Sequence, residues 1–451
     1  MATRRILRLP HADLWAVGII FFLSRVQWIV ELHYHSDQRA PASIVVVLCA
    51  SLFLIIAGLV LTRFMSDRSF AILARAMVLA AFLYFVATLL RPLFVSEDGI
   101  ARSWKVVIGV FAIILAGFAA VRVAAVWPRL RAALLAMVVT ASTLTFALAA
   151  LLAPRIELLA DSRDRHRPVV VLLLDEFSAG SAQELTNALA ARRLQVDSWA
   201  VPHIGRNTLD AVPGMFSGSF LKDARICTGS AVCNNTGSVD FARMRVGRND
   251  VDVVGIYHPY CAIEGLRHCE DLQPAPGKSA TVSFLCGSPL HFLIGTLLGC
   301  DRARDDLLSA EDAAAVNRKL FAAPFWTRGG LLYAHLMIPH PPSASGEPRL
   351  EDAYRANLER ASVLVLSVID HLERGALRDD FTLVITSDHP LRSELWCRTE
   401  PYASNDCRLP QSMVGPEVPF IVATRGGPAE HLEPRSNADL LPIVTQLSVA
   451  R

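Results

Sequence analysis

Side chains that can bind a metal ion directly follow two apolar segments of this chain. Residues 169–174 lead into Asp175 and Glu176, and residues 381–385 lead into the sequence Thr-Ser-Asp-His at 386–389. Carboxylates and imidazoles together suit zinc, manganese or a similar divalent ion. Two strands that each end on such side chains therefore predict a metal site. The alternative for each carboxylate is an ordinary turn at the end of a strand.

A threonine supplies a candidate nucleophile. Thr208 begins the segment 208–213, just before an apparent helix start. A threonine hydroxyl is a poor nucleophile at neutral pH, but a bond to a metal lowers its pKa, and the free amides of a helix start can receive a phosphoryl oxygen. Thr208 is thus predicted to be both a metal ligand and the attacking group. The alternative is that Thr208 only caps the helix.

The elements that must position these residues alternate between strands and helices. Continuous apolar segments such as 169–174 are typical of strands that are buried on both faces of a parallel sheet. Further strands are expected at 251–257, 331–337 and 418–423, and helices at 181–193, 311–321, 351–373 and 437–447. This alternation predicts an α/β sandwich with a mostly parallel central sheet. Ligands collect beyond the carboxyl ends of such strands, so Asp175, His340 and Asp388 should lie along one edge.

The apolar residues, 53% of the 451, are concentrated before residue 154. Runs of about 20 apolar residues can cross a bilayer core. Five such spans are predicted, at 12–32, 42–62, 71–91, 105–126 and 132–153. The first span contains Arg25 and Glu31, so four spans are the alternative.

The basic residues of the first third predict the orientation in the membrane. Arg4, Arg5, Arg8, Arg63, Arg68, Arg129 and Arg131 share one side if there are five spans. This bias favours a cytoplasmic N-terminus, and an odd number of spans then exports everything after Pro154. We therefore expect an α-helical transmembrane domain at 1–154, a short linker at 155–167 and an exported catalytic domain at 168–451.

The cysteines agree with export. Eight of the nine lie after the apolar third, in close pairs: 227 with 233, 261 with 269, 286 with 300, and 397 with 407. An even set of this kind favours disulfides in an oxidising compartment. The alternative is free or zinc-binding thiols, although no Cys-x-x-Cys pair is present. A net charge of +2 and the lack of a basic stripe interleaved with aromatic residues argue against a nucleic-acid partner.

Five motifs in chain order resemble the alkaline phosphatase and sulfatase superfamily. They are Asp-Glu at 175–176, T-L-D-A-V-P-G-M-F-S-G from Thr208, A-H-L-M-I-P-H-P-P at 334–342, S-D-H at 387–389 and R-S-N-A-D-L-L-P-I-V at 435–444. In architecture the chain resembles the bacterial membrane phosphoethanolamine and phosphoglycerol transferases, which have five spans followed by an exported catalytic domain. The resemblance covers residues 168–448.

The resemblance implies one zinc or manganese ion and a phospho-threonine intermediate. The implied ligands are Asp175, Thr208, Asp388 and His389, and Thr208 would carry the phosphoryl group. The transferases usually have a glutamate where the Asp-Glu pair stands here, so Glu176 is the alternative to Asp175.

The resemblance also implies residues that contact the substrate. His340, and with it His335, would bind the phosphate or protonate the leaving group, although His335 is equally well explained as a buried structural histidine. Pro390 replaces the usual glycine after Asp-His, and Arg392 beyond it is a candidate for contact with substrate anions.

The implied function is transfer of a phosphorylated headgroup from a membrane phospholipid to an envelope glycan or glycolipid. The expected location is a bacterial inner membrane, with the catalytic domain in the periplasm. One alternative is a membrane-anchored sulfatase-like hydrolase of phosphodiesters or sulfate esters. Sulfate esters are the weaker substrate class, because no cysteine stands in the C/S-x-P/A-x-R context that sulfatases use. Another alternative is a catalytically inactive protein of envelope biogenesis.

Overall fold

The structure is a computed structural model, and it describes most of the chain. The described residues are 9–35, 66–94, 126–152, 155–159, 167–234, 237–272, 310–341, 346–398, 402–404, 409–411, 413–426 and 432–448, with isolated positions between 51 and 64 and at 407. The chain divides into two compact units. The first comprises Met1–Leu151, Cys227–Gly229 and Lys278–Ala303, and the second comprises Leu152–Ile226, Ser230–Gly277 and Arg304–Arg451.

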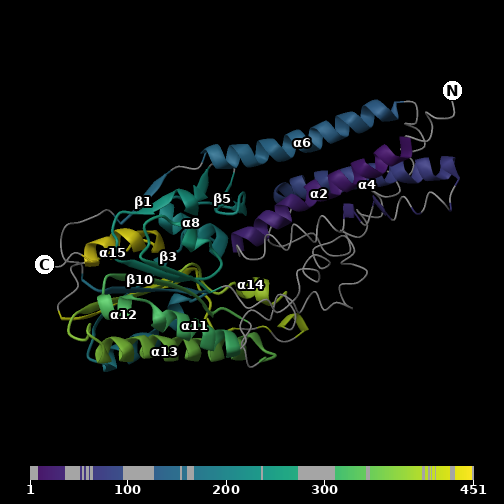
Figure 1. Cartoon of the computed structure of the whole chain (residues 1–451). Coiled ribbons are helices and arrows are strands. Elements are labelled where there is room, and N and C mark those ends of the chain that lie inside the picture. Colours follow the sequence, from purple (N-terminus) through teal and green to yellow (C-terminus); the bar gives the residue numbers. More distant parts are fainter. Residues whose placement is uncertain are drawn as a thin grey trace. The chain divides into compact units, whose positions relative to one another are not determined.

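Three long helices are described in the first unit, and they fall where the first, third and fifth apolar stretches were predicted (Figure 1). They are α2 (Leu9–His35), α4 (Asp67–Phe94) and α6 (Trp127–Leu152). Asp13 of α2 is buried and accepts hydrogen bonds from Trp127 Nε1 at 2.8 Å and from Arg131 Nη1 at 2.7 Å. These bonds fix α6 to α2.

The predicted membrane spans are tested only in part. Within the described residues, no helix combines the length and the hydropathy that are needed to cross a bilayer. The predicted spans at 42–62 and 105–126 lie almost entirely outside the described residues. The membrane location of the chain therefore stays a prediction.

The second unit is built on a seven-stranded sheet with the order β3-β12-β11-β2-β10-β8-β9. Its strands are β2 (Val169–Asp175), β3 (Gln195–Pro202), β8 (Val251–Gly255), β9 (His268–Asp271), β10 (Leu331–Pro339), β11 (Phe381–Ser387) and β12 (Glu417–Arg425). The strands from β11 through to β9 pair in parallel, while β12 is antiparallel to both of its neighbours. The predicted α/β domain with a mostly parallel central sheet is confirmed.

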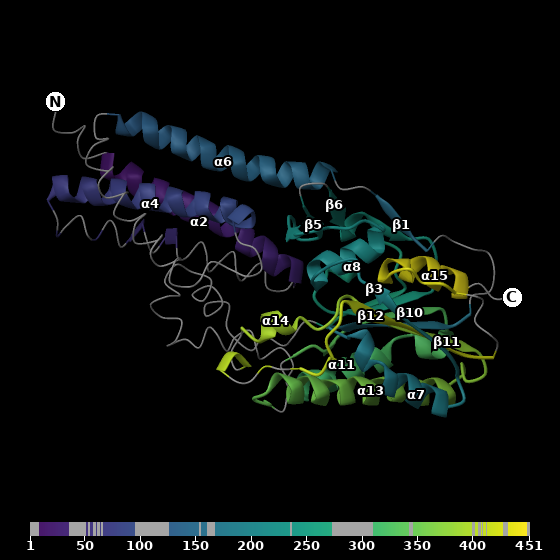
Figure 2. The same ribbon diagram turned by 180° about the vertical axis from the view of Figure 1, so that it is seen from behind.

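Helices cover both faces of this sheet (Figures 1 and 2). One face carries α7 (Gln183–Ala191), α11 (Ala310–Ala322), α12 (Phe325–Arg328) and α13 (Leu350–Arg374), and the other carries α8 (Thr208–Ser217) and α15 (Leu440–Ser448). Every residue of β2 is buried, as expected for a strand between two layers of helices. Val170, Leu172 and Leu174 pack into the core beneath α13. The alternate residues of β2 therefore point towards the layer of α8.

Several elements were not predicted. The edge strands β3 and β9 extend the sheet, and a three-stranded sheet forms from β4 (Arg225–Ile226), β5 (Ala231–Cys233) and β6 (Ser238–Asp240). Within the predicted linker, β1 (Ile156–Leu158) pairs in parallel with β7 (Met244–Val246). That part of the linker thus belongs to the folded domain.

Two of the predicted disulfides are confirmed. Cys261 is bonded to Cys269, and Cys397 is bonded to Cys407. Cys227 and Cys233 also take part in disulfides. The predicted pair of cysteines 286 and 300 lies outside the described residues. The alternative of free or zinc-binding thiols is therefore wrong for these six cysteines.

Candidate metal centre

The sheet register brings three ligand-type side chains to one face of three neighbouring strands. His335 of β10 and Thr386 of β11 both pair with Leu173 of β2. Side chains alternate along a strand, so Asp175 and Asp388, each two positions later, point to the same face as His335. This is the face that α8 covers.

These three side chains form a buried cluster of hydrogen-bond acceptors. The ligand atoms of Asp175, His335 and Asp388 all lie within 4.8 Å of one another. Asp175 Oδ1, Asp388 Oδ2 and His335 Nε2 find no hydrogen-bond partner among the described residues. Buried acceptors without a donor are costly, and two carboxylates close together also repel each other. A divalent cation would satisfy all three atoms, and this donor set suits zinc or manganese.

His389 lies beside the same carboxylates. Its Nε2 atom is 3.3 Å from Asp388 Oδ2 and 3.6 Å from Asp175 Oδ1. Its Nδ1 atom lies 3.0 Å from the carbonyl oxygen of Pro390. Because a carbonyl can only accept a hydrogen bond, we assign the proton to Nδ1. The lone pair of Nε2 then faces the cluster, as a metal ligand requires.

The candidate nucleophile is next to this cluster. The Thr208 hydroxyl oxygen lies 3.4 Å from His389 Nε2. Thr208 is the first residue of α8, and the cap of this helix is Asn207, whose side chain accepts from Asp210 N at 2.9 Å. The capping role is therefore filled by Asn207. The Thr208 hydroxyl is left to face the acceptor cluster at the amino-terminal end of a helix.

Asn437 connects the end of β11, which carries Asp388, to the segment that leads into α8 and Thr208. Its Nδ2 atom donates to the carbonyl oxygens of Ser387, at 2.9 Å, and Asp388, at 2.8 Å. Its Oδ1 atom accepts from Ile204 N, at 2.9 Å, in the segment before α8. The Asn437 side chain thereby ties the end of β11 to the approach of α8. The motif at 435–444 contains this residue, but nothing in the sequence revealed its partners.

Glu176 belongs to a second group of residues. It has a left-handed φ of 61°, and its carboxylate accepts from Arg392 Nε at 2.6 Å and from Trp396 Nε1 at 2.7 Å. Both carboxylate oxygens are thus engaged by donors, which favours Asp175 as the metal ligand. His340 lies against Trp396, with 5.0 Å between the ring centroids, so the two predicted histidines fall in different groups.

Burial controls the charges of the cluster. Burial, followed by the nearby charge of Asp388, raises the pKa of Asp175 well above its ordinary value. Burial lowers the pKa of His335 to about 4 and the pKa of His389 to about 3. Both imidazoles are therefore neutral near pH 7, which is the form that binds metals.

The second group, Glu176 with Arg392 and Trp396, is in its charged form, unlike the neutral imidazoles of the cluster. Burial, the largest single effect, raises the pKa of Glu176, but the charge and hydrogen bond of Arg392 together with the neighbouring His340 and His389 outweigh it, and the net pKa is lowered. Glu176 in turn raises the pKa of Arg392 against the effect of burial. The pair is therefore fully ionised near pH 7. It places a permanent guanidinium beside the metal cluster.

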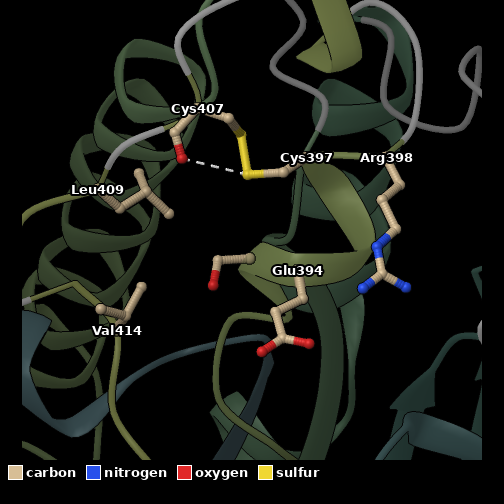
Figure 3. A pocket seen from close by; sticks show the side chains of 7 residues that line it. Glu394, Cys397, Arg398, Cys407, Leu409 and Val414 are labelled. Atoms are coloured by element: carbon tan, nitrogen blue, oxygen red, sulfur yellow. Dashed lines mark hydrogen bonds between the residues drawn. A yellow bond between two sulfur atoms is a disulfide. The ribbon is translucent and has the colours of Figure 1, made fainter.

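A pocket of about 330 Å³ adjoins this second group (Figure 3). Its lining residues are Ser393, Glu394, Cys397, Arg398, Cys407, Leu409 and Val414. The first lining residue, Ser393, directly follows Arg392 and begins α14 (Ser393–Trp396). The Cys397–Cys407 disulfide forms part of the pocket wall. No residue of the metal cluster lines it. The pocket is therefore separate from the acceptor cluster, and α14 joins it to the second group through Trp396, which donates to Glu176.

Known proteins were compared with the chain. No family model matches the sequence, and no curated protein does. A protein of the alkaline phosphatase superfamily from Vibrio parahaemolyticus is similar in structure, at 14% identity and a TM-score of 0.37, over 68% of this chain and 74% of that one. The periplasmic domain of the phosphoethanolamine transferase EptC from Campylobacter jejuni is similar at 14% identity and a TM-score of 0.37, over 65% and 92%.

A third solved structure gives a similar result. The soluble domain of lipooligosaccharide phosphoethanolamine transferase A from Neisseria meningitidis matches at 13% identity and a TM-score of 0.31, over 60% of this chain and 82% of that one. These values are too low to support any argument about the reaction, which rests on the residues described above. The chain is thus similar in structure to a protein of the alkaline phosphatase superfamily and to domains of two phosphoethanolamine transferases.

Proposed function

We propose that this chain is a membrane-anchored, metal-dependent transferase. It takes a phosphorylated headgroup from a membrane phospholipid and passes it to an envelope glycan or glycolipid. One observation carries the proposal: the Thr208 hydroxyl lies beside a buried cluster of ligand atoms that find no donors among the described residues.

The five residues that would hold the metal come from four places in the chain. They are Asp175, Thr208, His335, Asp388 and His389. A bound zinc or manganese ion supplies positive charge that lowers the pKa of the threonine hydroxyl and offsets charge on the phosphoryl oxygens. The protein contributes the arrangement of donors and a site that excludes water.

Thr208 performs the first step of the proposed reaction. Its oxygen forms a bond to the phosphorus of the lipid diester, and the bond from phosphorus to the lipid oxygen breaks with its electrons. The proton that Thr208 gives up ends on the departing lipid oxygen, with His340 as the predicted donor to that oxygen. In the second step an acceptor oxygen attacks the phosphorus, the bond to Thr208 breaks, and the acceptor's proton restores the hydroxyl.

Arg392 is placed to bind the anionic part of the substrate. Its Nε atom is held by Glu176, and its side chain remains 24% exposed. A guanidinium that is fixed at one edge can present its remaining N–H groups to a phosphate in a set orientation. The group is therefore organised before the substrate arrives.

A product assay tests this function. The purified full chain is incubated with zinc or manganese, a phospholipid labelled in its headgroup, and a candidate glycolipid acceptor. We expect labelled acceptor with the wild-type chain, and a loss on the order of 10⁴-fold with Thr208→Ala. Thr186→Ala, which changes a threonine of α7, is the control. Free headgroup without labelled acceptor would identify a hydrolase, and the lack of any product together with the lack of bound metal would identify an inactive protein.

A further inference from the structure

A tyrosine holds His335 from the side away from the carboxylates. Tyr260 lies in the short 3-10 helix η3 (Tyr260–Ala262), and its hydroxyl is 2.7 Å from His335 Nδ1. Both residues are buried, with 2% of Tyr260 and none of His335 exposed. The sequence analysis assigned no role to Tyr260.

The hydrogen bonds around His335 determine which ring nitrogen carries the proton. Nε2 is without a partner among the described residues, whereas Nδ1 lies 2.7 Å from the Tyr260 hydroxyl oxygen, so a buried N–H is satisfied only on Nδ1. With the proton on Nδ1, the Tyr260 oxygen, 2.7 Å away, accepts this hydrogen bond. Nε2 then carries a lone pair. That lone pair lies among the ligand atoms of Asp175 and Asp388.

The surroundings hold the Tyr260 ring in one orientation. The ring packs against Phe216, Phe241 and Tyr333 with centroid distances of 6.1, 5.7 and 5.7 Å. A Cβ atom on Gly255 would overlap the Tyr260 ring, so this position in β8 requires glycine. Tyr260 is therefore a rigid support, and it does not depend on the substrate for its position.

We infer that Tyr260 is a positioning residue that fixes the tautomer and the ring orientation of His335 for a divalent cation. The inference rests on the metal centre of the proposed function. A histidine ligand normally donates its second ring N–H to a neighbouring acceptor, and such a neighbour orients the ring and increases its basicity. Tyr260 reaches the site through the His335 ring. Its effect should therefore appear in metal binding before it appears in catalysis.

Metal titration of the full chain tests the inference. Zn²⁺ is titrated into the metal-free wild-type chain, into Tyr260→Phe and into Tyr402→Phe, which removes the hydroxyl of another buried tyrosine. We expect Tyr260→Phe to raise the Kd for Zn²⁺ by about 10- to 100-fold, and Tyr402→Phe to leave it within about twofold of the wild type. With Co²⁺ as the probe, the visible absorption spectrum of Tyr260→Phe should also change, because the spectrum reports ligand geometry. Equal affinities and equal spectra for wild type and Tyr260→Phe would overturn the inference.

A second measurement is made on the wild-type chain and does not depend on the folding of Tyr260→Phe. Nitrogen-15 NMR of histidine-labelled, metal-free wild-type chain, with His335→Gln used for assignment, reports which ring nitrogen carries the proton. We expect the proton on Nδ1 of His335, and a proton on Nε2 would overturn the inference. If the wild-type chain binds neither Zn²⁺ nor Co²⁺, the proposed function itself is wrong and the inference is lost with it. If the wild type binds metal and Tyr260→Phe binds it equally well, only the inference is lost.

Discussion

At the scale of single residues, the adjacent acids Asp175 and Glu176 have different partners. Asp175 faces the acceptor cluster, whereas Glu176 turns into the left-handed region and binds Arg392 and Trp396. Asp175 is the last residue of β2, whereas Glu176 lies just beyond the strand in a left-handed conformation, and this turn of the backbone separates the two carboxylates. Adjacent acids after one strand can therefore serve a metal site and an anion-binding site at once.

Replacing Glu176 by glutamine should separate these two roles. The substitution removes the charge that holds Arg392 while leaving the metal cluster unchanged. We expect Glu176→Gln to bind one metal ion per chain as the wild type does, to lose about 1–3 kcal/mol of stability, and to raise KM more than it lowers kcat. Metal analysis, thermal unfolding and steady-state kinetics check these outcomes. Asp175→Asn is the matched comparison, because this variant should no longer bind the metal. Loss of metal from Glu176→Gln would contradict the proposed roles of the two acids.

A partly buried histidine away from the site gives a prediction about pH. Burial, and then the charge of Arg374, lowers the pKa of His371 below 6.5, and its ring packs on Trp326 at a centroid distance of 4.7 Å. The unfolded chain therefore takes up a proton near pH 6.5 that the folded chain resists. The stabilising contribution of neutral His371 is present above pH 6.5 and is lost as the pH falls below it.

The variant His371→Gln isolates this contribution. We expect the stability of the wild type, relative to His371→Gln, to decrease as the pH is lowered from about 7.5 to about 5.5. Urea unfolding of both proteins at several pH values measures the difference. A difference that stays constant, or that grows towards acid pH, would show that the ring is not held neutral.

The sequence predicted that Asp175, Asp388 and His389 lie close together because strand ends in a parallel sheet meet at one edge, whereas Thr208 was added to them by the family resemblance. The sequence could not show that His335 lies in the metal cluster while His340 lies beside Trp396. That distinction depends on the register of β10 against β2 and on the position of Trp396, and neither is encoded locally. The same holds for Asn437, whose partner Ile204 lies 233 positions away in the sequence.

At the scale of elements, the buried strands and long helices were predictable, and the edges of the sheet were not. The core strands β2 and β11 are continuous apolar runs, and α13 matches the predicted helix at 351–373 closely. In β3 only one of the eight residues, Val201, is buried. A strand that is mostly accessible lacks the apolar pattern on which such predictions depend. Its pairing with β12 decides its structure.

The disulfide after α14 should support the substrate side of the site. Cys397 follows Trp396 directly and is bonded to Cys407. Opening this bond in a Cys397→Ser/Cys407→Ser variant frees the end of α14, and so loosens the hold of Trp396 on Glu176. We expect a loss of about 2–4 kcal/mol of stability and a raised KM, with metal affinity unchanged.

A second pair of cysteines provides the comparison. Cys261 follows Tyr260, so a Cys261→Ser/Cys269→Ser variant should act on the metal side of the site. Kinetics and Zn²⁺ titration of both variants separate the two effects. The assignment of the two disulfides to the substrate side and the metal side would be wrong if opening the Cys397–Cys407 bond weakened metal binding and left KM as in the wild type.

At the scale of the whole molecule, the metal should contribute to the stability of the second unit. Its ligands come from β2, α8, β10 and the end of β11, so a bound ion would link four elements. Without the ion, the unpaired acceptors and the repulsion between two carboxylates remain in the core. The sequence predicted the fold of this unit well. The membrane location of the chain stays a prediction, because no described helix is long and apolar enough to cross a bilayer.

Chelation tests the stabilising effect of the metal. We expect removal of metal from the full chain to lower its Tm, and Zn²⁺ at about 100 times its Kd to restore about 2.7 kcal/mol. The variant Asp388→Asn should show a much smaller response to Zn²⁺. Differential scanning calorimetry measures all three. Equal responses of wild type and Asp388→Asn would place the ion elsewhere.

The most direct test of the account is the chemical state of Thr208 during turnover. The full chain is incubated with metal and candidate phospholipids, quenched in acid, and analysed by intact mass and by fragmentation of the peptide that contains Thr208. We predict a phosphoryl adduct, with the donor headgroup attached, on Thr208 of the wild-type chain and on no other residue, and no adduct on Thr208→Ala. An adduct at another residue, or turnover by Thr208→Ala at the wild-type rate, would contradict the account.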